Sequence, residues 1–211
     1  TKGDLLEGAT SEAIGNNGLF LQNILTLVPD RLDLMTTLRY DNMTFASDDR
    51  LFGVRNAGRK FNRTTPKGAL NYKLTPHVAA YASYGLSFDT PADNEMDNYP
   101  TSSNPTPLLN PDLKAQKSKN LEAGIKGSAD GPAGSVFGRV NFELSVFNIL
   151  TEDEIVPFDV FGDVFYRNAA ESDRTGIEAG MTAVVAHDFT VRASYAWSDF
   201  TYSAYTARST E

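Results

Sequence analysis

Arginine and aromatic residues gather in three segments of the chain whose other residues are mostly polar. A guanidinium group beside aromatic rings can hold a flat, anionic metal chelate, because the rings stack on it and the cation binds its charge. The candidate ligand-binding residues are Arg55, Arg59, Phe88, Tyr99, Phe158, Phe161, Phe165 and Arg167. We expect them on two long loops and around a tip at residues 162–163.

Two other groups of residues could bind a metal ion. The run Glu152-Asp153-Glu154, with Asp159 and Asp163 nearby, offers the oxygen ligands that hard cations prefer. The run lacks EF-hand spacing and contains no histidine, so a solvated loop surface is the favoured interpretation. The two histidines are far apart in the sequence, and each follows an apolar segment at a short turn. We therefore expect turn histidines and no metal site.

The sequence contains none of the common catalytic motifs. It has no glycine-rich phosphate loop, no Ser-His-Asp order and no metalloprotease helix motif. Its lack of cysteine excludes a disulfide framework, a thiolate metal site and a cysteine nucleophile. The net charge of -8, without a compact basic patch, argues against nucleic acid as a partner. We expect neither an enzyme nor a bound cofactor.

The segments between these groups alternate between apolar and polar residues. From residue 136 to 146 every even position is apolar or glycine, whereas Arg139, Asn141, Glu143 and Ser145 occupy odd positions. Because strand side chains alternate between faces, such a segment has one apolar and one polar side. No apolar run approaches the roughly 18 residues of a membrane helix.

Eight strands can be predicted from this alternation. They span residues 18–28, 32–45, 61–74, 78–89, 117–128, 135–147 (extending as far as 160), 164–186 and 189–202. Short turns alternate with longer loops, of which 46–60 and 90–116 are rich in polar residues. Strands of about 10 or more residues with this alternation of connections are typical of an up-and-down outer-membrane β-barrel.

Several segments resemble the barrels of TonB-dependent outer-membrane receptors. Residues 113–126 resemble the family's segment Leu-Lys-Pro-Glu-x-Ser-x-x-x-Glu-x-Gly-x-Lys, with Ser118, Glu122, Gly124 and Lys126 in register. Ala115 and Gln116 replace the usual Pro-Glu pair.

Three further segments support the resemblance. Residues 37–41 resemble Gly-Leu-Arg-Tyr-Asp, with Thr37 in place of glycine, and residues 81–88 resemble Tyr-x-Ser-Tyr-x-x-x-Phe. Residues 165–169 and 174–178 resemble the family's Tyr-x-Asn-x-Gly…Arg-x-Gly-x-Glu strand, which is most familiar in siderophore receptors. The order and spacing of these motifs cover nearly the whole chain.

The resemblance implies an all-β fold, in which residues 1–211 form roughly eight antiparallel strands of a larger transmembrane barrel. Family barrels have about 22 strands and a plugged lumen, so we expect a partial barrel without the plug domain, the TonB-contacting segment or the closing strand. The implied function is TonB-dependent uptake of a ferric siderophore or similar metal chelate across the bacterial outer membrane. The implied partners are that ligand, outer-membrane lipid and the TonB system, which would act through the plug.

Charges on the polar side of the strands would face the lumen. They are Arg39, Asp41, Lys67, Lys73, Glu122, Lys126, Arg139, Glu143, Glu178 and Arg192. They could contact a plug and line a hydrated path, or they could simply be solvated and paired across strands, which is the favoured interpretation for any single residue. Tyr84 and Tyr195 are expected in an aromatic girdle.

Two other classes of protein remain open. A passive porin-like or structural outer-membrane barrel would share the strand pattern and conduct ions without an energy source. A soluble all-β binding module would bury its apolar face, including Leu34, Leu38, Val140, Phe142 and Leu144, against a second sheet.

Overall fold

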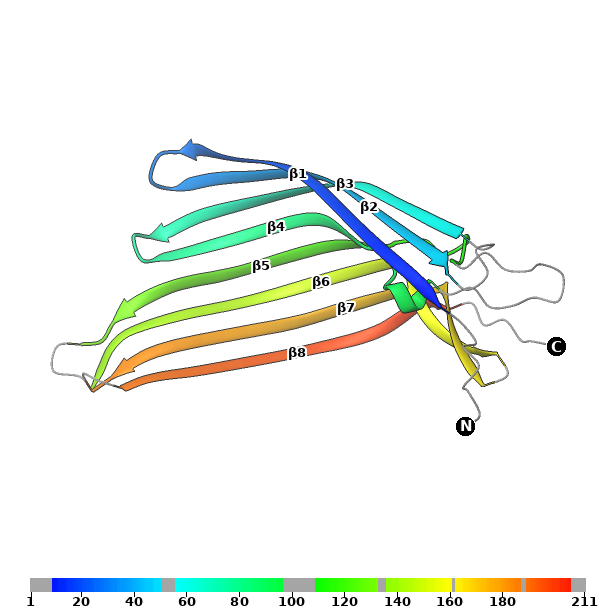
Figure 1. The fold of residues 1–211 in the computed structure, drawn as a ribbon. Helices are drawn as coiled ribbons and strands as arrows, with labels where there is room; N and C mark the ends of the chain where they lie inside the picture. The colour runs from blue at the N-terminus through cyan, green and yellow to red at the C-terminus, as the bar shows by residue number, and fades with distance from the viewer. Residues whose placement is uncertain are drawn as a thin grey trace.

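The protein forms a single antiparallel sheet of eight strands in sequence order, as a computed structural model shows (Figure 1). The structure describes residues 9–50, 56–96, 109–132, 136–160, 162–186 and 189–205. Three candidate ligand-binding residues, Arg55, Tyr99 and Phe161, lie outside these ranges, as does His187. The strands are β1 (Thr10–Val28), β2 (Leu32–Asp49), β3 (Asn56–Thr75), β4 (Val78–Asp89), β5 (Gln116–Asp130), β6 (Phe137–Val160), β7 (Asp163–Val185) and β8 (Phe189–Tyr205).

The expected fold class is confirmed, but most strands are longer than the sequence pattern predicted. The predicted loop 46–60 is wrong over most of its length, because β2 continues to Asp49 and β3 begins at Asn56. In this region Asp48 pairs with Asn56 and Ser47 with Ala57. A ladder is made by backbone hydrogen bonds, so it can continue where the side chains on both faces are polar. Alternation of hydrophobicity therefore marks only part of each strand.

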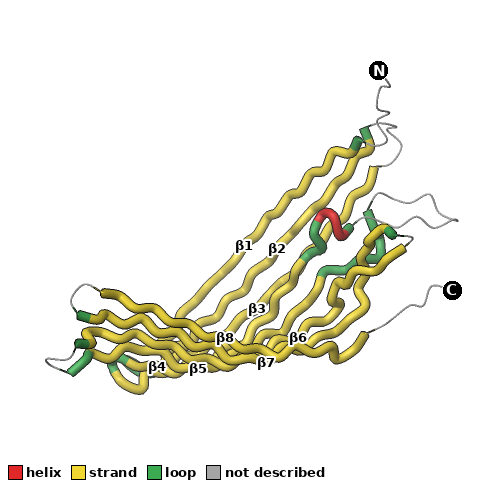
Figure 2. The backbone as a smooth tube through the Cα atoms, turned by 90° about the horizontal axis from the view of Figure 1, so that it is seen from below, coloured by secondary structure: helices red, strands yellow, loops and turns green. Residues whose placement is uncertain are grey.

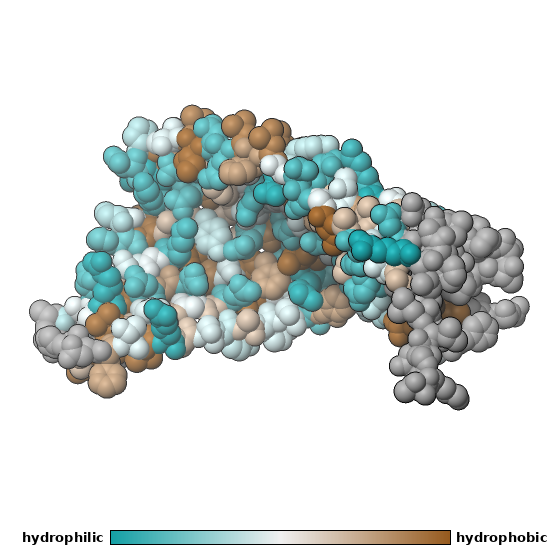
Figure 3. Space-filling model, in the orientation of Figure 1, coloured by the Kyte–Doolittle hydropathy of each residue, from teal (hydrophilic) through white to brown (hydrophobic). Residues whose placement is uncertain are grey.

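The sheet is bent into an open trough (Figure 2). Its hollowed side, here called the inner face, holds a cavity of about 790 Å³ lined by residues of β1 to β6, including Asp33, Lys67, Tyr81, Glu122 and Lys126. In Figure 3, which shows this side, hydrophilic residues predominate over the middle strands. Among the described residues β1 and β8 do not pair with each other, so the sheet is not closed.

The opposite side, here called the outer face, exposes large apolar side chains. Leu144 and Val146 of β6 are 44% and 51% exposed, and Trp197 of β8 is 51% exposed. Within the described part of the chain there is one sheet and no second layer to cover this face. The soluble module required Leu34, Leu38, Val140, Phe142 and Leu144 to be buried. Three of them are half-buried, and Leu38 and Leu144 are 51% and 44% exposed, which contradicts this alternative.

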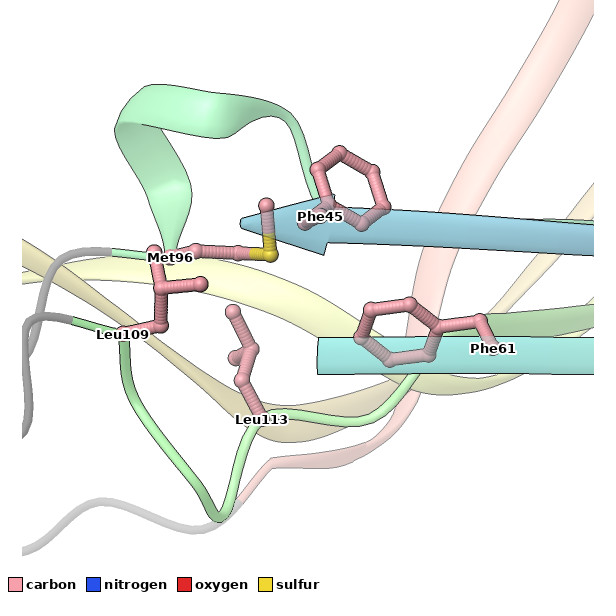
Figure 4. Close-up of a cluster of buried hydrophobic side chains, with 5 residues drawn as sticks. All are labelled: Phe45, Phe61, Met96, Leu109 and Leu113. Carbon is pink, nitrogen blue, oxygen red and sulfur yellow. The ribbon is translucent and has the colours of Figure 1, made fainter. Parts of the chain in front are cut away.

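One adjacent pair of strands separates along its length. β3 pairs with β4 only between Lys67–Thr75 and Val78–Gly85, although β3 continues back to Asn56. Residues 109–115, here called the loop strap, precede β5 and lie beside the unpaired half of β3. A small apolar cluster joins them to the sheet: Phe45, Phe61, Met96, Leu109 and Leu113 are buried together (Figure 4).

Candidate functional site

Three of the candidate residues come together on the hairpin formed by β6 and β7. Phe158 pairs directly with Phe165, and Arg167 pairs with Val156 two positions along the same face. The two rings are 6.3 Å apart, and the guanidinium carbon of Arg167 lies 5.0 Å from the centre of the Phe158 ring. Their grouping around the tip was expected, and all three residues lie within the strands of the hairpin, because β6 continues to Val160 and β7 begins at Asp163.

Arg59 has a structural role that the sequence did not reveal. It lies within β3 and donates hydrogen bonds to the carbonyl oxygens of Asn110 (3.0 Å), Pro111 and Leu113 (2.5 Å). Its guanidinium also lies 5.2 Å from the centre of the Phe61 ring. Burial lowers the pKa of Arg59, and the carboxylate of nearby Asp112 partly offsets that effect. These contacts hold the loop strap against β3 and engage the N–H donors of Arg59.

Phe88 is likewise part of the packing. It lies near the end of β4 and packs against the buried cluster around Leu113. Asn168 fixes the other side of the loop strap: it accepts a hydrogen bond from the Lys114 amide (2.7 Å) and donates to the Lys114 carbonyl (2.9 Å). The loop strap is therefore tied to β3 on one side and to β7 on the other.

The acidic run 152–154 is part of β6, so its prediction as a solvated loop surface is wrong. Asp153 adopts a φ of 56° where the β6–β7 register shifts. Its carboxylate forms ion pairs with the Nζ atoms of Lys117 at 2.8 Å and Lys114 at 3.6 Å. The hydrogen bond from Lys117 is the main cause that lowers the pKa of Asp153, and burial opposes it. Glu152 pairs with Lys119 at 2.5 Å. The described residues contain no group of three or more possible metal ligands, and His77 lies in the short turn after β3.

Some of the inner-face charges have partners within the sheet. Arg39 contacts Asp41 at 2.6 Å, Lys73 contacts Asp33 at 3.9 Å, and the Tyr81 hydroxyl donates to Glu122 at 2.5 Å. The first contact lies within β2, whereas the other two join neighbouring strands and agree with cross-strand pairing as the role of those groups. A second hollow of about 270 Å³ lies beside them and includes Glu143 and Glu178.

A cluster that the sequence did not single out lies on β7 and β8. The guanidinium carbon of Arg174 is 5.4 Å from the centre of the Phe200 ring, and the Tyr202 ring contacts the rings of Phe200 and Tyr205 edge to face. Alternation indicated that Phe200 and Tyr202 share a face. Tyr205 is three residues further on, and only the register of the folded sheet shows which face it joins.

The family model for the TonB-dependent receptor-like β-barrel matches residues 7–211. The chain belongs to this family. The match confirms the predicted family and agrees with the curved, antiparallel sheet of eight strands. In the part of the chain that the structure describes, no helix is long and apolar enough to span a bilayer.

Solved structures of similar fold include three transport proteins. The copper transporter OprC matches with a TM-score of 0.70 and 16% identity, over 92% of this chain and 29% of that one. The alcaligin outer-membrane receptor FauA from Bordetella pertussis matches with a TM-score of 0.66 and 19% identity, over 95% of this chain and 32% of that one. The ferric-catecholate import receptor Fiu from E. coli K12 matches with a TM-score of 0.69 and 18% identity, over 94% of this chain and 29% of that one. The chain thus spans about a third of the length of the structures that it matches.

Proposed function

We propose that this chain forms part of the barrel of an outer-membrane receptor that imports a ferric siderophore or a similar metal chelate with energy from the TonB system. The family supplies the receptor class, and neighbours named for siderophore and metal transport favour this kind of ligand. In this proposal the plug domain lies in another part of the parent protein. The chain binds and guides its ligand and catalyses no reaction.

The observation that carries the proposal is the contrast between the two faces of the sheet. Along β8, Val191, Tyr195 and Trp197 point to the outer face and are 47%, 62% and 51% exposed. The next residues on that face, Asp199 and Thr201, are polar. An exposed apolar band that ends abruptly is what lipid contact followed by water requires. The tyrosines expected in the girdle, Tyr84 and Tyr195, are both exposed on this face, at 51% and 62%.

The same band indicates which parts of the strands leave the membrane. It covers the strand halves next to the short turns, such as those at residues 29–31 and 76–77. The other halves continue toward the longer connections, and on β8 the outer face of this half carries Asp199 and Thr201. About 10 residues suffice to cross a bilayer at a tilt, whereas β6 and β7 have 24 and 23 residues. Their hairpin therefore projects beyond the membrane, with Phe158, Phe165 and Arg167 on it as candidate ligand contacts.

Energy-dependent uptake separates this proposal from a passive barrel. We expect cells that carry the intact parent protein to accumulate a radiolabelled ferric chelate, and to lose this uptake when the TonB system is deleted or the proton gradient is collapsed. A passive porin-like barrel would instead give continuous ion conductance in a planar bilayer and uptake independent of TonB. That second result would overturn the proposal.

A further inference from the structure

We propose that Arg174, Phe200, Tyr202 and Tyr205, here called the aromatic ledge, form a binding surface for an anionic chelate with a flat aromatic face. The inference rests on the proposed function and adds to it the place and the chemical class of the ligand.

The register of the sheet places all four side chains on the inner face. Arg174 pairs with Phe200, and Ser172 pairs with Tyr202. The two β7 residues, Arg174 and Ser172, point to the same face as Glu178, which lines the inner hollow. Directly opposite residues of an antiparallel pair point to the same face. The ledge therefore continues the polar inner face toward the ends of β7 and β8 that lie away from their short turn.

A bulge in β8 brings Tyr205 to this face. Tyr202 pairs with Ser172, but Ala204 pairs with Glu171, which leaves Ser203 as an extra residue. A bulge of this kind re-aims the side chains that follow it. Without it Tyr205 would point to the outer face, so the bulge adds a third ring to the row.

The residues beneath and beside the rings are small. Ala170 and Ser172, which pair with Tyr205 and Tyr202, are each 5% exposed. A Cβ atom on Gly176 would collide with the Phe147 ring, so glycine at this position lets a ring from β6 lie over β7. Arg174 is thus the one long side chain of β7 between Ala170 and Gly176 on this face.

The rings are exposed in this sheet, although all residues of its edge strand β8 are exposed. Phe200, Tyr202 and Tyr205 are 41%, 51% and 52% exposed, and the ring of Tyr202 meets those of Phe200 and Tyr205 edge to face, at centroid distances of 5.1 and 5.8 Å. Within the described residues, Arg174 has no carboxylate at ion-pair distance, whereas Arg39 and Arg139 each have one. An exposed row of aromatic rings with an unneutralised guanidinium favours a ligand that is both flat and negatively charged.

The location is also favourable for capture. The outer-face apolar band of β8 ends at Trp197, and Phe200 follows three residues later. The ledge therefore lies just beyond the proposed membrane zone, where a ligand from outside would first reach the inner face of the barrel.

Equilibrium binding to the intact, purified receptor in detergent tests the inference. The probes are the ferric complex of a synthetic tricatecholate, which is anionic and aromatic, and the ferric complex of a trihydroxamate, which has no aromatic ring. We expect the tricatecholate to bind more tightly. Arg174→Gln should weaken its binding about tenfold or more, because a charge-assisted contact is lost, and Arg174→Lys should restore part of it.

The tyrosine variants have a matched control on the same strand. Tyr202→Ala combined with Tyr205→Ala should weaken tricatecholate binding roughly 3- to 30-fold through lost ring contacts. Tyr195→Ala removes a tyrosine of β8 from the outer face and should leave binding within about twofold of the wild type, because it removes no ledge contact. Arg192→Gln is the corresponding arginine control.

The possible results separate the two proposals. If the Arg174 and tyrosine variants bind the tricatecholate as tightly as their controls while TonB-dependent uptake persists, the ledge is overturned and the proposed function stands. Preference for the trihydroxamate would overturn the ligand class in the same way. If the wild-type receptor binds neither chelate and shows no TonB-dependent uptake, both proposals are overturned.

Discussion

At the scale of single residues, the arginines of this chain show why residue type alone does not identify a ligand contact. Arg59 and Arg174 are each next to a phenylalanine ring, at 5.2 Å and 5.4 Å. Arg59 uses its N–H donors on carbonyl oxygens of the loop strap, whereas Arg174 has no ion-pair partner among the described residues. The sequence could predict that arginines and aromatics would meet. It could not predict which arginine would be committed, because the partners of Arg59 are 51 to 54 positions further along the chain.

Replacing Arg59 should therefore loosen the loop strap and leave the inner face intact. Arg59→Gln leaves part-buried carbonyl groups without donors, which typically costs about 1–3 kcal/mol. We expect faster amide hydrogen exchange in a peptide covering residues 109–118 of the intact protein and unchanged exchange in β4. Arg192→Gln serves as the control, since Arg192 is exposed on β8. Equal protection of the loop strap in both variants would show that Arg59 does not hold it.

At the scale of elements, hydrophobic alternation predicted the existence of all eight strands and the bounds of β4, but not the full length of most of the others. Alternation reports which strand halves have one apolar face. It does not detect a strand where both faces are polar, as at the paired ends of β2 and β3 around Asp48 and Asn56. It also cannot place a bulge, because one extra residue such as Ser203 leaves no mark in the composition of a strand.

The bulge in β8 leads to a prediction of its own. Deleting Ser203 should restore regular pairing and turn Tyr205 from the inner to the outer face. Because β8 would keep its ladder with β7, we expect tricatecholate binding to fall about as far as in Tyr205→Ala, with little change in thermal stability. Tyr195→Ala is the control, since it alters β8 ahead of the bulge and on the other face. Binding equal to that of the wild type would contradict the assigned role of the bulge.

At the scale of the whole molecule, the fold class and family followed from the sequence, whereas the ligand-binding surface did not. Alternating strands and turn spacing were enough for the barrel, since both report a backbone periodicity, and four local motifs carried the family resemblance. The aromatic ledge depends on residues of β7 and β8 that meet only through register. The division between an apolar outer face and a polar inner face was predicted, and it determines how substitutions should act.

A charge introduced on the outer face should be far more destabilising than the same charge on the inner face. Leu144→Arg would place a guanidinium within the apolar band, for which about 2–4 kcal/mol is expected near the bilayer centre. Asn141→Arg is the matched control, because Asn141 lies on the inner face of the same strand and is exposed. Urea unfolding of the intact protein in lipid vesicles measures both. Equal free energies of unfolding for the two variants would refute the assignment of the faces.

The separation of β3 from β4 has a consequence for engineering. Beyond Lys67 and Gly85 no ladder of main-chain hydrogen bonds joins these neighbours within the described residues. The loop strap lies against this part of β3, where Arg59 holds it, and Asn168 ties its other side to β7. Between the other neighbouring strands, an opening through the side of the sheet would require breaking a ladder of main-chain hydrogen bonds. Here no strand pair would have to be broken; the contacts of Arg59 and Asn168 and the apolar packing of Leu109 and Leu113 hold the loop strap in place, which makes this seam the natural position for an engineered side entrance.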